Sequence, residues 1–166
     1  MKILGIDPGY GRCGIAVVEK ENGRETLLHS ACIETSAKKE FPERLAKVIK
    51  ECSLLIKKHR PDVMALEKLF FTKNQKTAMR VAEVRGAIIS EATKHSLPVH
   101  EYTPNEIKSA VASSGNASKQ QVAAMLKLLL KIEKEVKYDD EWDAIAVAMT
   151  HLAVDRATTP RTKNLT

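Results

Sequence analysis

The sequence predicts an α/β fold in which one mixed central sheet of about five strands is flanked by helices. Three observations support this prediction. Strand-like apolar stretches fill the first third of the chain, apolar residues then recur at helical spacing, and two more strand-like stretches alternate with the helices that follow. A single sheet with helices on its faces is the layered arrangement that buries the apolar surface of all these elements.

The first three strands are predicted at residues 2–7, 13–19 and 26–34. Pro8-Gly9 separates the first two strands and Asn22-Gly23 separates the next two, and Asn-Gly is a strong signal for a tight hairpin turn. We therefore expect three consecutive antiparallel strands.

Helices and strands alternate in the middle of the chain. The first helix should end near Arg60, because Pro61 follows it, and residues 62–67 are predicted to form a short buried strand. A second helix is expected over residues 75–95 and a fifth strand near residues 98–100. The first helix is marked by apolar residues at helical spacing, namely Leu45, Val48, Ile49, Cys52, Leu55 and Ile56.

Two capping boxes mark helix starts in the last third of the chain. Residues 103–106 combine a Thr cap, a proline at the first helical position and a returning glutamate, and residues 118–121 repeat the arrangement with Ser and Gln. Small residues at 112–116 form the loop between these two helices. The last helix is expected from about Asp140 to Asp155.

The length of the chain favours one domain. Its 166 residues can bury a sizeable core, so we expect a single domain over residues 1–156 and a polar, flexible tail over residues 157–166. The formal net charge of +6 suits a polyanionic partner such as nucleic acid, although many soluble proteins are as basic as this.

The cysteines and the hydropathy pattern predict a cytoplasmic protein that makes no use of a membrane. Cys13, Cys32 and Cys52 form no CxxC pair, so three small buried residues in a reducing compartment are favoured over a disulfide framework or a zinc site. Asp7 interrupts the first apolar run, which argues against a signal peptide, and no apolar stretch approaches the ~20 residues of a membrane helix.

Four acidic residues are candidates for chemistry. Asp7 and Glu67 each end a predicted strand, and Asp140 and Asp143 lie three residues apart on one face of the last helix. If the fold brings them together, their carboxylates repel one another unless cations lie between them. Oxygen ligands of this kind select Mg²⁺ or Mn²⁺, and two such ions about 4 Å apart support phosphodiester cleavage.

Each acid taken alone also has a purely structural interpretation. Asp7 precedes Pro-Gly and can begin a turn, and Glu67 can be a solvated strand end beside Lys68. Acidic residues in the first turn of the last helix are expected from capping and from the helix dipole. The occurrence of all four, in the order strand, strand and helix, favours the functional interpretation.

Four segments of the chain resemble the RuvC family of Holliday-junction resolvases, which are bacterial endonucleases with a ribonuclease-H-like fold. One such motif alone would be weak, because other ribonuclease-H-like nucleases share the opening Asp-Pro-Gly segment. Four in the family's order between Lys2 and about Leu152 are specific. The segments are ILGIDPGYGRCGIAVVE, MALEKLFFTKN, EIKSAVASSGNASKQQV and DEWDAIAVAMTH.

The resemblance implies that Asp7, Glu67, Asp140 and Asp143 are the four catalytic acids and bind metal. Asp139 stays open as an alternative to Asp140, because it lies four residues before Asp143 and on nearly the same helix face. By the same resemblance the ions are two Mg²⁺ per active site, with Mn²⁺ as a possible substitute.

Three further residues gain a DNA-binding role from the resemblance. Lys108 and Lys119 match two lysines that face the cleavage site, although each could be an ordinary solvated lysine. Phe70 matches an aromatic residue that stacks on bases at the opened junction centre. Stacking by Phe71 instead, or core packing of both rings, remain alternatives.

The resemblance also implies the reaction and the partners. The expected substrate is a four-way DNA (Holliday) junction of recombination and repair, cut by symmetric paired nicks that leave 5′-phosphate and 3′-hydroxyl ends. A junction has two equivalent strands to cut, so a two-fold symmetric homodimer is expected, and the RuvA–RuvB branch-migration complex is the expected partner. The dimer contact is expected on the helix at residues 75–95, with Val81, Val84, Ile88 and Ile89 as candidates that could equally be core.

Three other classes of protein fit the sequence less well. A YqgF-like nuclease acting on RNA shares the fold and the opening Asp but lacks the whole set of motifs. A nucleotide-binding protein of the actin/Hsp70 type needs two such domains, and a non-catalytic DNA-binding module would have lost the acids. The chain also departs from the family pattern in its lysine-flanked loop, where Ser113 replaces a glycine and Asn116 a basic residue, and at Glu83-Val84, where Gln-Ala is expected.

Overall fold

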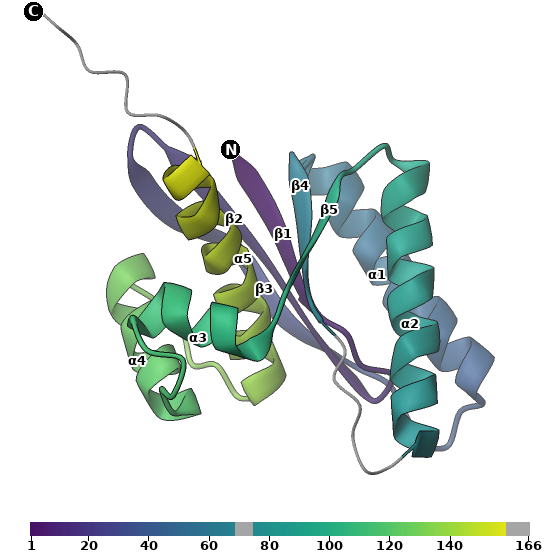
Figure 1. Cartoon of the computed structure of the whole chain (residues 1–166). Coiled ribbons are helices and arrows are strands. Elements are labelled where there is room, and N and C mark those ends of the chain that lie inside the picture. Colours follow the sequence, from purple (N-terminus) through teal and green to yellow (C-terminus); the bar gives the residue numbers. More distant parts are fainter. Residues whose placement is uncertain (69–74, 159–166) are drawn as a thin grey trace, which may run out of the picture.

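Five strands form one mixed sheet that carries helices on both faces in the computed structural model, which describes residues 1–68 and 75–158 (Figure 1). The strands are β1 (Lys2–Asp7), β2 (Arg12–Glu21), β3 (Arg24–Glu34), β4 (Val63–Glu67) and β5 (Val99–Tyr102). They lie in the order β3-β2-β1-β4-β5, so β1 occupies the centre of the sheet. The predicted α/β class with a mixed five-stranded sheet is confirmed.

The first three strands are antiparallel neighbours, as predicted. The turn between β2 and β3 places Asn22 at φ 50° and Gly23 at φ 79°, and this pair of left-handed residues matches the twist of the flanking strands. β4 pairs with β1 in parallel, and β5 pairs with β4 in parallel. Parallel pairing brings the carboxyl ends of β1 and β4 to the same edge of the sheet.

Two groups of helices cover the two faces of the sheet (Figure 1). Alternate residues of β1 point to opposite sides, so Ile3 packs with one group while Leu4 and Ile6 pack with the other. On one face lie α1 (Phe41–His59) and α2 (Gln75–Lys94). On the other face lie α3 (Pro104–Ala112), α4 (Lys119–Leu130) and α5 (Asp139–Thr158).

Helix ends follow the predicted signals. α1 ends at His59, and its cap residue Arg60 adopts the left-handed conformation just before Pro61. The hydroxyl of Thr103 accepts a hydrogen bond from the Glu106 amide at the start of α3. Ser118 does the same for Gln121 at the start of α4, so both capping boxes are confirmed.

Two of the four candidates for a dimer contact on α2 are wrong. Val84 and Ile88 are fully buried in the core cluster between α2 and the sheet, because they form the apolar stripe that faces β1 and β4. The exposed side of α2 carries Met79, which is 67% exposed.

α5 is buried through its middle and lies directly on β1 and β2. A Cβ at Gly5 would stand 2.3 Å from the backbone oxygen of Ala144, and a Cβ at Gly14 would stand 1.7 Å from that of Asp140. These two glycines therefore allow the backbone of α5 to approach the sheet. α5 continues to Thr158, beyond the predicted end at Asp155, since no glycine or proline follows before Pro160. Among the described helices, none is long and apolar enough to cross a membrane.

Candidate active site

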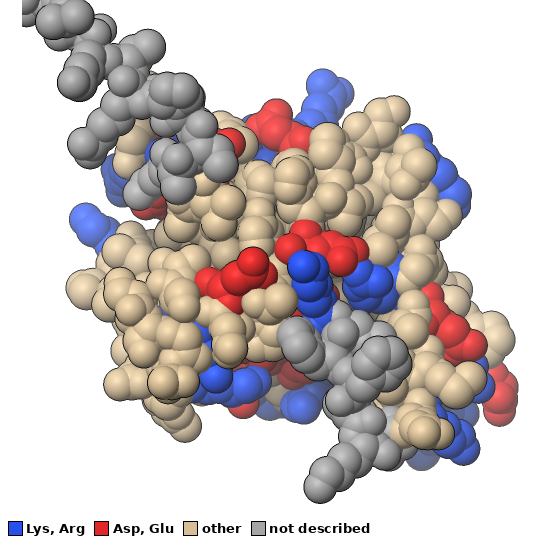
Figure 2. Space-filling model, viewed as in Figure 1, with Lys and Arg blue, Asp and Glu red and all other residues tan. Residues whose placement is uncertain are grey.

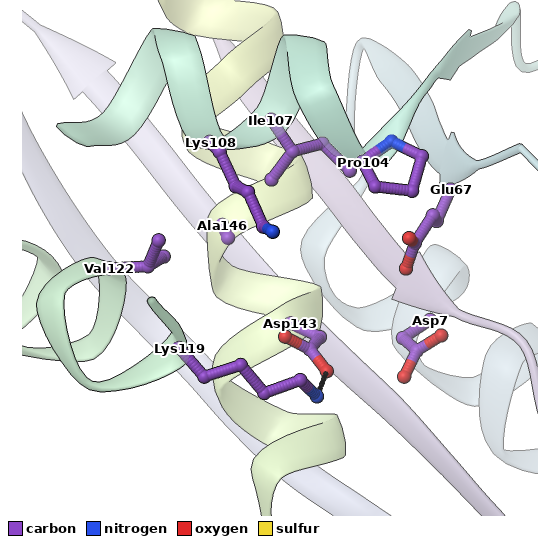
Figure 3. A pocket seen from close by; sticks show the side chains of 9 residues that line it. All are labelled: Asp7, Glu67, Pro104, Ile107, Lys108, Lys119, Val122, Asp143 and Ala146. Atoms are coloured by element: carbon purple, nitrogen blue, oxygen red, sulfur yellow. Dashed lines mark hydrogen bonds and ion pairs between the residues drawn. The ribbon is translucent and has the colours of Figure 1, made fainter. Parts of the chain in front are cut away.

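An acidic cavity of about 360 Å³ opens at the edge of the sheet where β1 and β4 end (Figure 3). Ile6 and Leu66 are register partners, so the next residues, Asp7 and Glu67, stand side by side at the carboxyl ends of two parallel strands. Both carboxylates line the cavity, and Asp143 of α5 lines it from the other side. Three of the four predicted acids therefore face one space.

The close approach of α5 to the sheet is what brings Asp143 to the strand ends. Gly14 of β2 is the register partner of Asp7, and the backbone of Asp140 lies against Gly14. The first turn of α5 is thereby fixed next to the end of β1. Asp143 lies one turn further along the helix and reaches into the cavity.

The carboxylates of the cavity are short of positive charge. The pKa of Asp7 is raised from 3.8 to about 7, first by burial and then by the charges of Glu67, Asp143 and Asp140. Burial also raises the pKa of Glu67, and the charge of Asp143 is the next largest cause. Each carboxylate resists ionisation because it is buried and because its neighbours are acidic too.

Lys119 supplies part of the missing charge. Its Nζ donates a hydrogen bond of 2.7 Å to Oδ2 of Asp143 (Figure 3). Burial alone would lower the pKa of Lys119, but this hydrogen bond and the nearby acids outweigh it and raise the pKa. Burial raises the pKa of Asp143, and the bond to Lys119 opposes that rise. Lys108 of α3 also lines the cavity, so both predicted lysines lie beside the acids.

Asp140 has a different partner and does not line the cavity. Its Oδ2 lies 3.2 Å from Nε of Arg12, the first residue of β2. That oxygen is buried and accepts no hydrogen bond within the described part of the chain, so the contact with Arg12 is purely ionic. Asp139 lines a neighbouring cavity beside Lys119, Trp142 and Asp143. The choice between Asp139 and Asp140 as a ligand stays a prediction.

A second cavity lies on the far side of Asp7 and Glu67. Both acids and Pro104 line it, together with Lys68 of the segment after β4 and Arg85 of α2. Basic side chains thus stand on both sides of the acids, and Figure 2 shows red and blue side chains next to one another near the centre of this face. Basic side chains on both sides of an acidic centre can hold a phosphate backbone across it. Phe70 and Phe71 lie outside the described residues.

The acids fit a divalent cation in their chemistry. They offer only carboxylate oxygens, which Mg²⁺ and Mn²⁺ prefer, and a bound cation would offset the charge repulsion that raises the pKa of Asp7. Within residues 1–68 and 75–158, however, no group of three or more His, Cys, Asp or Glu side chains is arranged to hold an ion.

Sequence reasoning missed Arg12 and the two glycines beneath α5. Arg12 lies in the first segment that resembles the family, but nothing in that segment indicates its partner, which lies 128 residues further along the chain. A glycine in a strand can mark the close approach of another backbone, and this signal at Gly5 and Gly14 could have indicated the contact with α5.

Comparisons with known proteins agree on one family. Residues 3–151 match the family model described as crossover junction endodeoxyribonuclease RuvC. Proteins of that name from Petrotoga mobilis and Brevibacillus brevis are 46% and 43% identical over 151 residues, covering 91% of this chain and 93% and 91% of theirs. The structure of Thermus thermophilus RuvC in complex with a Holliday-junction substrate has a TM-score of 0.89 at 30% identity, covering 95% of this chain and 96% of that one.

A more distant match shows the fold alone. The yeast mitochondrial Holliday-junction resolvase Ydc2 has a TM-score of 0.69 at 19% identity, and the match covers 91% of this chain and 77% of Ydc2.

Proposed function

Because the chain belongs to the RuvC family of crossover junction endodeoxyribonucleases, with its ribonuclease-H-like fold, we propose that it resolves four-way DNA junctions by symmetric paired nicks that leave 5′-phosphate and 3′-hydroxyl ends. The observation that carries this proposal is the cavity in which Asp7, Glu67 and Asp143 meet beside Lys108 and Lys119. The match to the RuvC family model over residues 3–151 favours this function over that of a YqgF-like nuclease acting on RNA.

The family's dependence on a divalent metal accounts for the acids. Asp7, Glu67 and Asp143, with Asp140 as the fourth ligand, are proposed to hold two Mg²⁺ ions, for which Mn²⁺ can substitute. When bound, the ions supply an activated water and stabilise the leaving oxygen. Asp7, whose pKa of about 7 comes first from burial and then from the neighbouring acids, would give up its proton on binding a cation.

Lys108 and Lys119 are proposed to bind the scissile phosphate. Lys108 comes from α3 and Lys119 from the start of α4, and Figure 3 shows both side chains directed toward the acids. Lys119 is also the first residue of α4, where free backbone amides and the helix dipole favour an anion. A cation at this place stabilises the charge that develops on the phosphate during cleavage. Phe70 is proposed to stack on an unpaired base near the junction centre.

A homodimer is proposed because a junction offers two equivalent strands to cut. The contact is proposed on α2, which carries the exposed Met79 and the partly exposed candidates Val81 and Ile89. The RuvA–RuvB branch-migration complex is proposed as partner, and the cytoplasm as location, from family membership.

The test uses a labelled four-way DNA junction, with duplex DNA, splayed-arm DNA and RNA as controls. Wild-type protein and Asp7→Asn are each assayed with Mg²⁺ and with EDTA. We expect paired nicks in the junction alone, which EDTA and Asp7→Asn abolish while junction binding persists. Cleavage of RNA or plain duplex instead would contradict the substrate assignment, and binding without cleavage in any metal would contradict the enzymatic one.

A further inference from the structure

We propose that Arg12 holds Asp140 outside the acidic cavity and releases it only when a divalent cation binds, so that Arg12 sets the metal affinity of the site. This inference rests on the proposed function, in which Asp140 becomes a metal ligand. Arg12 is a positioning residue in this scheme, because it acts on the site only through Asp140.

The geometry around Asp140 supports this role. Arg12 approaches Oδ2 of Asp140 to 3.2 Å, and the side chain of Asp140 is only 21% exposed, whereas Arg12 is 52% exposed. Oδ2 accepts no hydrogen bond from the described residues, so nothing but the charge of Arg12 compensates it there. Asp140 is therefore directed at Arg12 and away from the cavity that the other three acids line.

Arg12 is itself held in place. It begins β2 two residues before Gly14, the register partner of Asp7, so its backbone is fixed beside the cavity. Its guanidinium also lies over the ring of Tyr138, with 5.3 Å between Cζ and the ring centroid. A cation–π contact of this kind keeps the guanidinium next to Asp140, two residues further along the chain.

Arg12 and Lys119 differ in where their partners point. Lys119 donates a hydrogen bond to Asp143, and both residues line the cavity, where the ammonium group can also contact a phosphate. Arg12 binds the acid that does not line the cavity, and among the cavities described above none has Arg12 in its lining. A cation that recruits Asp140 must therefore displace Arg12, and metal affinity is lowered by the strength of that ion pair.

Mn²⁺ binding without DNA measures this competition. The paramagnetic signal of free Mn²⁺ gives the affinity of the wild type, Arg12→Gln, Arg12→Lys and the control Lys137→Gln. Lys137 is a matched control, since it is exposed and lies over the same ring of Tyr138 at 4.8 Å without an ion pair to Asp140. For a partly exposed ion pair we expect Arg12→Gln to bind Mn²⁺ about fivefold more tightly, with Arg12→Lys and Lys137→Gln within about twofold of wild type.

A double variant separates this mechanism from a general charge effect. In an Asp140→Asn background, Arg12→Gln should give no gain in affinity, because the competing pair is already absent. An equal gain in both backgrounds, or weaker Mn²⁺ binding in Arg12→Gln, would overturn the inference. If wild type binds Mn²⁺ and Asp7→Asn weakens it while Arg12→Gln changes nothing, the proposed function stands and only the role of Arg12 fails. If Asp7→Asn leaves Mn²⁺ binding unchanged, the proposed metal site itself fails.

Discussion

The acidic site has two halves that differ in how their charge is compensated. The strand half consists of Asp7 and Glu67, which form no ion pair with any described residue and whose pKa values are raised first by burial and then by neighbouring acids. The helix half consists of Asp140 and Asp143, which are paired with Arg12 and Lys119. The strand half therefore depends on an added cation, while the helix half can be satisfied by the protein itself.

The two halves are also held in place differently. Asp7 and Glu67 end neighbouring parallel strands at the centre of the sheet, so backbone hydrogen bonds fix their spacing. The first turn of α5 is placed by packing against Gly14 and by the buried carboxylate of Glu141, which accepts hydrogen bonds from Ser30 and Lys134. We therefore expect the two halves to respond differently to substitution and to pH.

The largest effect is expected from the strand half. Asp7→Asn should lower the rate of junction cleavage by ~10³-fold or more, because the central ligand of the cavity is lost. Asp139→Asn and Asp140→Asn should differ from each other, with the larger loss marking the helix residue that acts as ligand. Single-turnover cleavage rates on a labelled junction measure all three. Equal rates for Asp7→Asn and wild type would contradict the assignment of the strand half.

The contribution of Asp7 to the stability of the metal-free protein should fall as pH rises from about 4 to about 7. An unfolded Asp7 ionises near 3.8, whereas the folded one keeps its proton until about pH 7, so the folded state binds more protons across this range. The loss is on the order of a few kcal/mol. Urea unfolding of wild type and Asp7→Asn in EDTA at several pH values measures it as the difference between the two free energies of unfolding, which should change by that amount over this range. Identical pH dependence in both proteins would contradict the raised pKa.

Gly14→Ala should disturb the helix half without changing a charge. The new Cβ would stand 1.7 Å from the backbone oxygen of Asp140, so α5 must move, and we expect a loss of about 3 kcal/mol in the free energy of unfolding. The matched control is Gly86→Ala on the exposed side of α2, where a Cβ meets nothing within 4 Å. That change should stabilise by about 0.5–1 kcal/mol, since alanine favours a helix. Denaturant unfolding compares the two.

A smaller effect is expected at the anchor of α5. Oε1 of Glu141 accepts hydrogen bonds of 2.7 Å from Ser30 and 2.5 Å from Lys134. Glu141→Ala removes the acceptor of the Ser30 hydroxyl and one of two acceptors of Lys134, which also donates to the Ser30 backbone oxygen, and should cost about 2 kcal/mol in denaturant unfolding, while Glu141→Gln, which keeps an oxygen, should cost less. Glu83→Gln serves as control, because its pair with Arg80 is exposed and should leave the unfolding midpoint unchanged. An unfolding midpoint for Glu141→Ala equal to that of wild type would contradict the role of Glu141 in anchoring α5.

The strand half of the site was predictable from the sequence, and the helix half only in part. Each strand that carries an acid is a short apolar run with a clear end, so Asp7 and Glu67 are located by local pattern alone. The helix start offers four acids in five residues, and which of them turn inward depends on how α5 is rotated against β2. The rotation of α5 is set by its packing against β2, so the residues near the helix start do not predict it.

Contacts between distant segments account for the rest of what the sequence left open. The pairing of Arg12 with Asp140 follows from the packing of α5 against β2, and that of Lys119 with Asp143 from the packing of α5 against α4, and no short-range signal specifies either. The burial of Val84 and Ile88 likewise depends on which side of α2 meets the sheet. The helices and strands themselves were predictable because hydrophobic period, capping boxes and Asn-Gly turns act locally.

The most direct test of the difference between the two halves is the number of protons released when Mn²⁺ binds. Calorimetry in two buffers of different ionisation enthalpy gives this number at pH 7. With a pKa of about 7 for Asp7, wild type should release about half a proton from this residue, and Asp7→Asn should lack that release. Equal proton release by the two proteins would contradict a strand half that is short of positive charge and is completed by a cation.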